Sequence, residues 1–137
     1  MRRGLLLALV LGGLLAGCGG ETDVTATPET VIGTVPGAET VDVSKGDSAA
    51  GKEIFTKTAS PPCATCHTFQ AAGSTATVGP DLDKVLAGKD ARFIVESITD
   101  PGAEVAAGYQ DIMPTDYKTQ LDDKQLADLV AFLQPKS

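Results

Sequence analysis

The sequence of 137 residues contains no tryptophan, one histidine, two methionines and three cysteines. Few side chains can therefore act as soft metal ligands. Basic residues are also scarce: 11 lysines and arginines stand against 18 acidic residues, a net charge of −7. Such a chain is poorly suited to bind nucleic acid, whose phosphates attract basic surfaces. The longest apolar run, residues 5–15, is too short for a transmembrane helix.

Two of the cysteines and the single histidine are clustered. Two residues separate Cys63 from Cys66, and His67 follows directly. This Cys-x-x-Cys-His spacing is the pattern that attaches a c-type haem, with two thioether bonds to the porphyrin and the imidazole on the iron. A dithiol redox centre and a zinc site are the alternatives for such a pair. The first would need a βαβ pattern and the second two more ligands, and neither is found near Cys63.

The other side of the iron has one candidate ligand. Because His67 is the only histidine, this chain supplies no second imidazole. Met1 belongs to the N-terminal signal region, which leaves Met113. It lies in a polar loop punctuated by proline, whereas a methionine that only fills a core would be expected on an apolar helix face. Since a thioether can complete a histidine-bound haem iron, the inventory favours Met113 as the second axial ligand.

The N-terminus is typical of an exported chain. Residues 1–17 combine Arg2 and Arg3 with a short apolar stretch, which predicts a signal peptide on the general secretory route. The end of this stretch resembles the lipobox of a bacterial lipoprotein, with cleavage before Cys18 and acylation of its thiol. An ordinary signal peptide with a chance cysteine is the alternative, but it leaves a free thiol outside the cell. We therefore expect a lipid anchor to the cell membrane, facing the periplasm or the extracellular side.

Two segments are predicted after the anchor. Residues 18–46 have scattered valines between Thr, Pro and Gly and no sustained periodicity, which indicates a disordered tether. Residues 47–137 form the predicted domain. Helices are expected from a cap at Asp47 or Ser48 to Phe55, over 82–86, over 90–100 after a cap at Asp90, and over 122–135 with Asp122 and Gln125 as a capping box.

From Asp47 onward the sequence resembles a single-haem class I cytochrome c. The resemblance is carried by the haem motif at residues 63–67, by Gly-Pro-Asp-Leu at 79–82 and by Met113-Pro114. It implies a small all-α fold, about four helices wrapped around one covalently bound haem c with its iron.

The same resemblance implies three further residue roles. The carbonyl of Pro80 would accept the Nδ1–H of His67, which leaves Nε2 for iron. Tyr109 would reach a haem propionate. Gly51 would let the C-terminal helix cross closely; a merely tolerated glycine is the alternative.

Residues 93–101, 108–109 and 113–114 resemble the cytochrome c domains that serve haem-copper terminal oxidases. This likeness implies an electron carrier and not an enzyme, with a quinol-oxidising complex as donor and a terminal oxidase as acceptor. If Met113 does not ligate, the alternative is a five-coordinate haem that senses a gas or acts like a peroxidase. A thiol–disulfide oxidoreductase is a more distant third.

Loss of the signal peptide would make the chain more acidic. Removing Arg2 and Arg3 from the 11 basic residues leaves 9 against 18 acidic ones. This charge either serves solubility alone or indicates that tethering at high effective concentration replaces electrostatic steering toward membrane partners.

Overall fold

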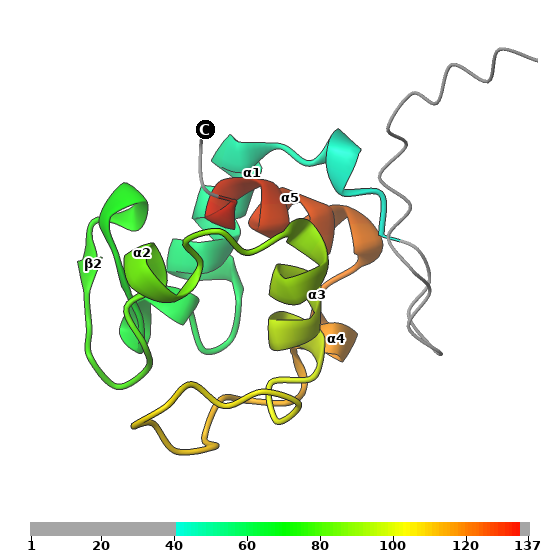
Figure 1. The fold of residues 1–137 in the computed structure, drawn as a ribbon. Helices are drawn as coiled ribbons and strands as arrows, with labels where there is room; N and C mark the ends of the chain where they lie inside the picture. Colours follow the sequence, from blue (N-terminus) through cyan, green and yellow to red (C-terminus); the bar gives the residue numbers. More distant parts are fainter. Residues whose placement is uncertain (1–40, 135–137) are drawn as a thin grey trace, which may run out of the picture. The chain divides into compact units, whose positions relative to one another are not determined.

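A computed structural model describes residues 41–134, and helices provide most of the regular structure in this part (Figure 1). The α-helices are α1 (Ser48–Glu53), α2 (Leu82–Val85), α3 (Ala91–Thr99), α4 (Tyr117–Gln120) and α5 (Asp123–Leu133). Shorter helical turns are Val43–Lys45, Ile54–Thr58, Cys63–Thr65 and Gln70–Ala72. The prediction of a mostly helical fold is confirmed. Within residues 41–134, no helix combines the length and the apolarity needed to cross a membrane.

The predicted helices correspond to α1 with the π-helical turn that continues it, α2, α3 and α5, whereas α4 was not predicted. The predicted caps are present. Asp47 accepts from the amides of Ala49 and Ala50, and Asp90 accepts from the amide of Phe93. Asp122 and Gln125 exchange both bonds of a capping box. These caps satisfy amides that the first turn of a helix leaves without partners.

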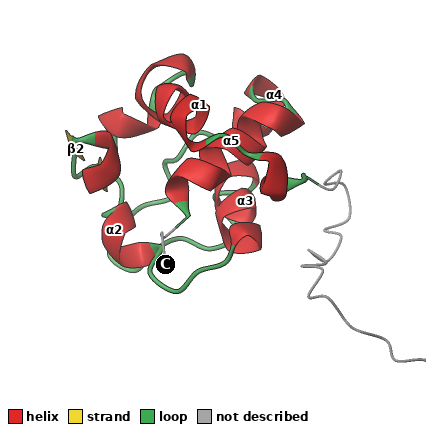
Figure 2. Ribbon diagram, turned by 90° about the horizontal axis from the view of Figure 1, so that it is seen from above, coloured by secondary structure: helices red, strands yellow, loops and turns green. Residues whose placement is uncertain are grey.

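The core is organised around the crossing of α1 and α5. Figures 1 and 2 show α5 between α1 and α3, and α5 contacts both helices. A Cβ atom built on Gly51 would lie 2.0 Å from the carbonyl oxygen of Asp128 and 2.8 Å from the Cβ of Phe132. The two backbones therefore approach as closely as only a glycine permits, which confirms the prediction for Gly51.

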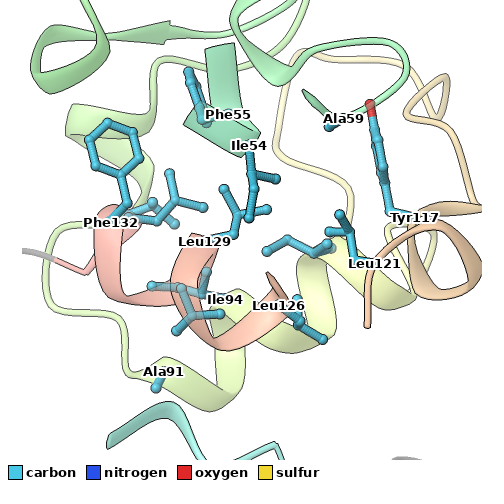
Figure 3. Packing of buried hydrophobic residues seen from close by; sticks show 14 of the residues in the cluster. Ile54, Phe55, Ala59, Ala91, Ile94, Tyr117, Leu121, Leu126, Leu129 and Phe132 are labelled. Carbon is cyan, nitrogen blue, oxygen red and sulfur yellow. The ribbon is translucent and has the colours of Figure 1, made fainter. Parts of the chain in front are cut away.

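Apolar side chains of α5 fill the space beneath this crossing. Leu129 and Val130 are almost fully buried, and Figure 3 shows Ile54 and Ile94 on either side of Leu129. Phe132 packs edge-on against Phe55 and Phe69, with ring centroids 5.7 Å and 5.3 Å apart. Edge-to-face aromatic pairs at such distances are favourable beyond the area they bury.

A two-stranded antiparallel hairpin joins the haem motif to α2. It pairs β1 (Thr68–Phe69) with β2 (Ser74–Thr75), with Thr68 opposite Thr75. Gly73 closes the turn at φ +74°, a left-handed conformation that favours glycine. The hairpin was not predicted, because strands of two residues are too short to show an alternating pattern.

The predicted boundary of the tether at residue 46 is wrong. Residues 41–46 are folded: Val43–Lys45 form a 3₁₀ turn, and Val41 and Val43 pack against the core. A Cβ on Gly46 would lie 2.3 Å from the carbonyl oxygen of Ala127, so this segment runs directly along α5. In the sequence the two valines are isolated apolar residues, but α5 supplies the surface that covers them. The rest of the predicted tether, 18–40, lies outside the described residues.

Candidate functional site

An open cavity of about 180 Å³ lies beside the core. Its walls come from the Cys63–His67 turn, from residues 78–86, from α3 with the following loop to Pro114, and from the inner face of α5. The six predicted site residues of the described part all line it: Cys63, Cys66, His67, Pro80, Tyr109 and Met113. The fold therefore brings together side chains up to 50 residues apart (113 minus 63). Cys18 lies outside the described residues.

A tight turn places the two cysteines and the histidine on the same wall. The amides of Cys66 and His67 both donate to the Cys63 carbonyl, at 3.1 Å and 3.0 Å. Burial raises the pKa of the Cys63 thiol to about 11. A reactive dithiol centre needs a lowered thiol pKa, so this environment speaks against the redox-dithiol alternative. Among residues 41–134, no group of three or more His, Cys, Asp or Glu side chains is arranged to hold a metal ion, so the zinc alternative finds no ligand set in this part of the chain.

The imidazole of His67 is fixed by its neighbours. Nδ1 lies 2.9 Å from the carbonyl oxygen of Pro80, which is the contact predicted for Pro80. Because a carbonyl oxygen only accepts, Nδ1 carries the proton and Nε2 keeps its lone pair. Burial lowers the pKa of His67, although the bond to Pro80 acts in the opposite sense. The lowered pKa favours the neutral ring, and the bond to Pro80 leaves Nε2 as its free nitrogen, the form in which histidine binds a metal.

Gly79 lets the chain pass directly beside this ring. A Cβ atom on Gly79 would lie 2.6 Å from Cε1 of His67 and 2.9 Å from Nδ1. The Gly79 amide also donates to the Cys66 carbonyl at 2.7 Å, which ties the Gly-Pro segment to the cysteine turn. The predicted Gly-Pro motif thus has two uses, since glycine provides the close approach and proline the acceptor.

The loop between α3 and α4 forms a wall of the cavity in which several apolar side chains remain exposed. Met113 is partly buried and packs against the core, whereas Ile112 beside it is 61% exposed. Tyr109 is 39% exposed and no hydrogen-bond partner of its hydroxyl is present among the described residues. The large exposed apolar residues of the described part, Val78, Val105, Tyr109 and Ile112, all line the cavity. Apolar surface gathered in this way marks a site that a large apolar ligand covers.

These features fit a covalently bound haem. The cavity has apolar walls, two thiols on one wall and an imidazole with a free Nε2. The thioether of Met113 lies in the loop between α3 and α4. Cys63 and Cys66 would hold the porphyrin edge, and His67 would meet the iron.

Sequence reasoning missed Tyr117 and Gln120. Tyr117 is buried in the cavity wall and donates from its hydroxyl to the Pro61 carbonyl at 2.7 Å. Its burial raises its pKa to about 12. Gln120 bonds to the backbone of Ser60. No local pattern announces these contacts, because the partners are 56 and 60 residues apart.

Comparison with known proteins agrees with the site. The sequence matches the family described as "Cytochrome c" over residues 48–136. Since this match spans well over half of the sequence, the chain belongs to the cytochrome c family. Haem c, with its iron, is the cofactor of this family. Membership of the family supports a role in electron transfer.

Among solved structures, the chain is similar to the c-type cytochrome SorU from Sinorhizobium meliloti. The identity is 27%, over 66% of this chain and 87% of that one, with a TM-score of 0.46. No curated protein sequence matches the chain.

Proposed function

We propose that the protein is a membrane-tethered electron carrier in which Cys63 and Cys66 hold haem c and His67 and Met113 are its axial ligands. The main support is that all four side chains line one apolar cavity, where the His67 ring has Nε2 free. Haem iron supplies one-electron transfer between its ferrous and ferric states. Two protein ligands leave no open position for a substrate, which favours a carrier over an enzyme.

The remaining residues of the site have supporting roles. Pro80 keeps the His67 proton on Nδ1 and holds the ring in place, and such outer contacts tune ligand orientation and basicity. The apolar walls exclude water, and thioether ligation by Met113 with burial raises the reduction potential. Tyr109, at the exposed rim, would contact a propionate. A high potential suits a position late in a respiratory chain.

An absorption spectrum of the oxidised protein tests the ligation. The wild type is expected to be low-spin with a weak iron–sulfur charge-transfer band, and Met113→Ala is expected to lose this band. Thr115→Ala, an exposed position two residues later in the same loop and outside the cavity lining, is the matched control and should keep it. A high-spin wild type that binds carbon monoxide readily would instead support the five-coordinate sensor or peroxidase-like enzyme.

The tether is proposed from the N-terminal sequence. Residues 1–17 have the pattern of a lipoprotein signal peptide, and acylated Cys18 would anchor the exported chain to the cell membrane. The mature chain would carry 9 basic against 18 acidic residues, so docking through a lysine patch is disfavoured. Anchoring would instead keep the domain at about millimolar effective concentration near membrane partners. A quinol-oxidising complex is the proposed donor and a terminal oxidase the proposed acceptor.

Respiration by washed membranes tests the tether. Cys18→Ala should leave the haem spectrum intact but slow electron delivery, because the released domain is diluted. A chimera in which a transmembrane helix replaces the lipid anchor should restore the rate. Unchanged respiration by washed Cys18→Ala membranes would refute this part of the proposal while leaving haem ligation untouched.

A further inference from the structure

The segment leading into the first cysteine is held by α4. The amide of Ser60 donates to Oε1 of Gln120 at 3.1 Å, and the Ser60 carbonyl accepts from Nε2 of Gln120 at 2.7 Å. The Pro61 carbonyl accepts from the Tyr117 hydroxyl at 2.7 Å. Because proline has no N–H, these three bonds use every backbone polar group of Ser60 and Pro61. The segment thus takes all its backbone partners from one distant helix.

A further contact fixes the orientation of the Gln120 amide. Its Nε2 also donates to Oδ2 of Asp116 at 2.9 Å. A carboxylate only accepts hydrogen bonds, so this contact keeps Nε2 on the Asp116 side and turns Oε1 toward the Ser60 amide. Asp116, Tyr117 and Gln120, together with the backbone of Ser60 and Pro61, are called the α4 clamp below.

The α4 clamp connects the two parts of the chain that carry the haem-binding side chains. On one side, Ser60 and Pro61 are followed by Pro62 and Cys63. On the other side, α4 begins four residues after Met113, and Tyr117 and Met113 line the same cavity. Figure 3 shows the Tyr117 ring extending toward Ala59, at the start of the cysteine approach. The loop that carries Met113 contains no helix or strand between α3 and α4, so its C-terminal end is fixed where α4 is fixed.

We propose that the α4 clamp sets the position of Met113 relative to the haem-attachment turn. Gln120 and Tyr117 are positioning residues: they act through the Met113 loop and keep the thioether within reach of the iron. This inference rests on the proposed ligation by His67 and Met113. It assigns a function to two residues that lie in a helix of only four residues and that no local motif marks.

Competition with imidazole tests the inference in the intact, haem-loaded protein. Gln120→Ala removes both hydrogen bonds to Ser60, each with a modest net contribution, together with the bond to Asp116. Met113 should then be displaced more easily, and the affinity for added imidazole should rise by about tenfold. Tyr117→Phe keeps the ring and removes one bond, so a rise of about threefold is expected. Lys118→Ala, an exposed position of the same helix, is the matched control and should leave the affinity unchanged.

Two further measurements separate positioning from general stability. Amide hydrogen exchange at Ser60 should accelerate in Gln120→Ala, since this amide loses its partner. Asp128→Asn, which weakens the contact of the Asp128 carboxylate with the Asp47 amide at the start of α1, should lower the melting temperature without raising the imidazole affinity. The proposal is supported if Ser60 exchanges faster in Gln120→Ala, the imidazole affinity of that variant rises about tenfold, and the imidazole affinity of Asp128→Asn stays unchanged.

Three results would overturn the inference. One is unchanged imidazole affinity in Gln120→Ala despite faster Ser60 exchange, which would make the clamp purely structural. Another is a Ser60 amide that exchanges no faster in that variant. The third is an equal rise in Asp128→Asn. A wild type without the iron–sulfur band is distinguishable from all three, because it would refute the ligation itself before any variant is made.

Discussion

The α1–α5 crossing and the cavity beside it are built in opposite ways. At the crossing, Gly51 lets two backbones touch, and Leu129 and Val130 are almost fully buried. At the cavity, Val78 and Ile112 remain 56% and 61% exposed. The crossing is therefore closed by protein alone, whereas the cavity has apolar walls that no segment within residues 41–134 covers.

This difference indicates what each region requires to be stable. The crossing gains its stability from packing within the polypeptide. The cavity needs a large apolar group to bury its walls, and haem provides that group. A domain of this size has only a modest core of its own. The two regions should consequently respond to different perturbations.

Preventing haem attachment should have the largest effect. In Cys63→Ser/Cys66→Ser the cavity walls would stay exposed to water, and we expect the chain to be largely unfolded. Thermal unfolding followed by circular dichroism should show no cooperative transition at the temperature seen for the haem-loaded protein. A cooperative transition at that temperature would mean that the crossing alone sustains the fold.

Gly51→Ala should be the most damaging single substitution at the crossing. The added Cβ would meet the Asp128 carbonyl at 2.0 Å, so a backbone has to shift. We expect a loss of about 2–3 kcal/mol in the free energy of unfolding, even after the better helix propensity of alanine is included. Denaturant titration of the haem-loaded protein measures this. Lys52→Ala, on the exposed side of α1, is the control and should change stability by less than about 0.5 kcal/mol.

Asp128→Asn should have an intermediate effect that depends on pH. The buried Asp128 carboxylate accepts from the Asp47 amide at 2.6 Å and from the Lys124 ammonium group. Burial alone would raise the pKa of Asp128, but these bonds outweigh it and hold the pKa below its ordinary value. We expect the substitution to cost about 1–2 kcal/mol near neutral pH.

The sign of the pH dependence follows from the lowered pKa. The carboxylate binds a proton less readily in the folded chain than in the unfolded chain, so its contribution is complete above the unfolded pKa of about 3.9. It is lost as the pH falls through the folded pKa. The difference in stability between wild type and Asp128→Asn should therefore shrink below about pH 4. A difference that is constant between pH 7 and pH 3 would contradict the ionised pair.

Gly79→Ala should have the smallest effect on stability but a clear effect on the site. The added Cβ would lie 2.6 Å from the His67 ring, which has to tilt and lengthen its bond to Pro80. We expect a loss of about 1 kcal/mol in stability together with a changed reduction potential and haem spectrum. Gly51→Ala should show the reverse pattern, with a larger loss of stability and an unchanged spectrum. Equal spectral changes in both variants would show that the two regions are not independent.

Local patterns allowed much of the site to be predicted. The spacing of Cys63, Cys66 and His67 and the scarcity of other ligands identified the cavity residues, because a haem motif is contiguous in sequence. The bond from His67 to Pro80 was implied by the resemblance to class I cytochromes c, which the short Gly-Pro-Asp-Leu motif at 79–82 helps to carry. The caps at Asp47, Asp90 and Asp122 are likewise properties of single elements.

Features that depend on distant contacts could not be predicted. The α4 clamp joins residues 56 to 60 positions apart, and nothing in either segment identifies its partner. Val41 and Val43 looked like tether residues, because the surface that covers them belongs to α5. Asp128 stands within an apolar helix face, and its burial depends on the amide of Asp47, which is 81 residues away in sequence.

Mass spectrometry of the exported full-length protein tests the central claim most directly. Trypsin cleavage after Lys57 and Lys84 would release a peptide, residues 58–84, with both cysteines of the motif. We expect this peptide to carry the mass of one haem and to have no thiol left to alkylate. A peptide of unmodified mass with two alkylatable thiols would contradict it, since the cavity would then lack the group that its walls are built to hold.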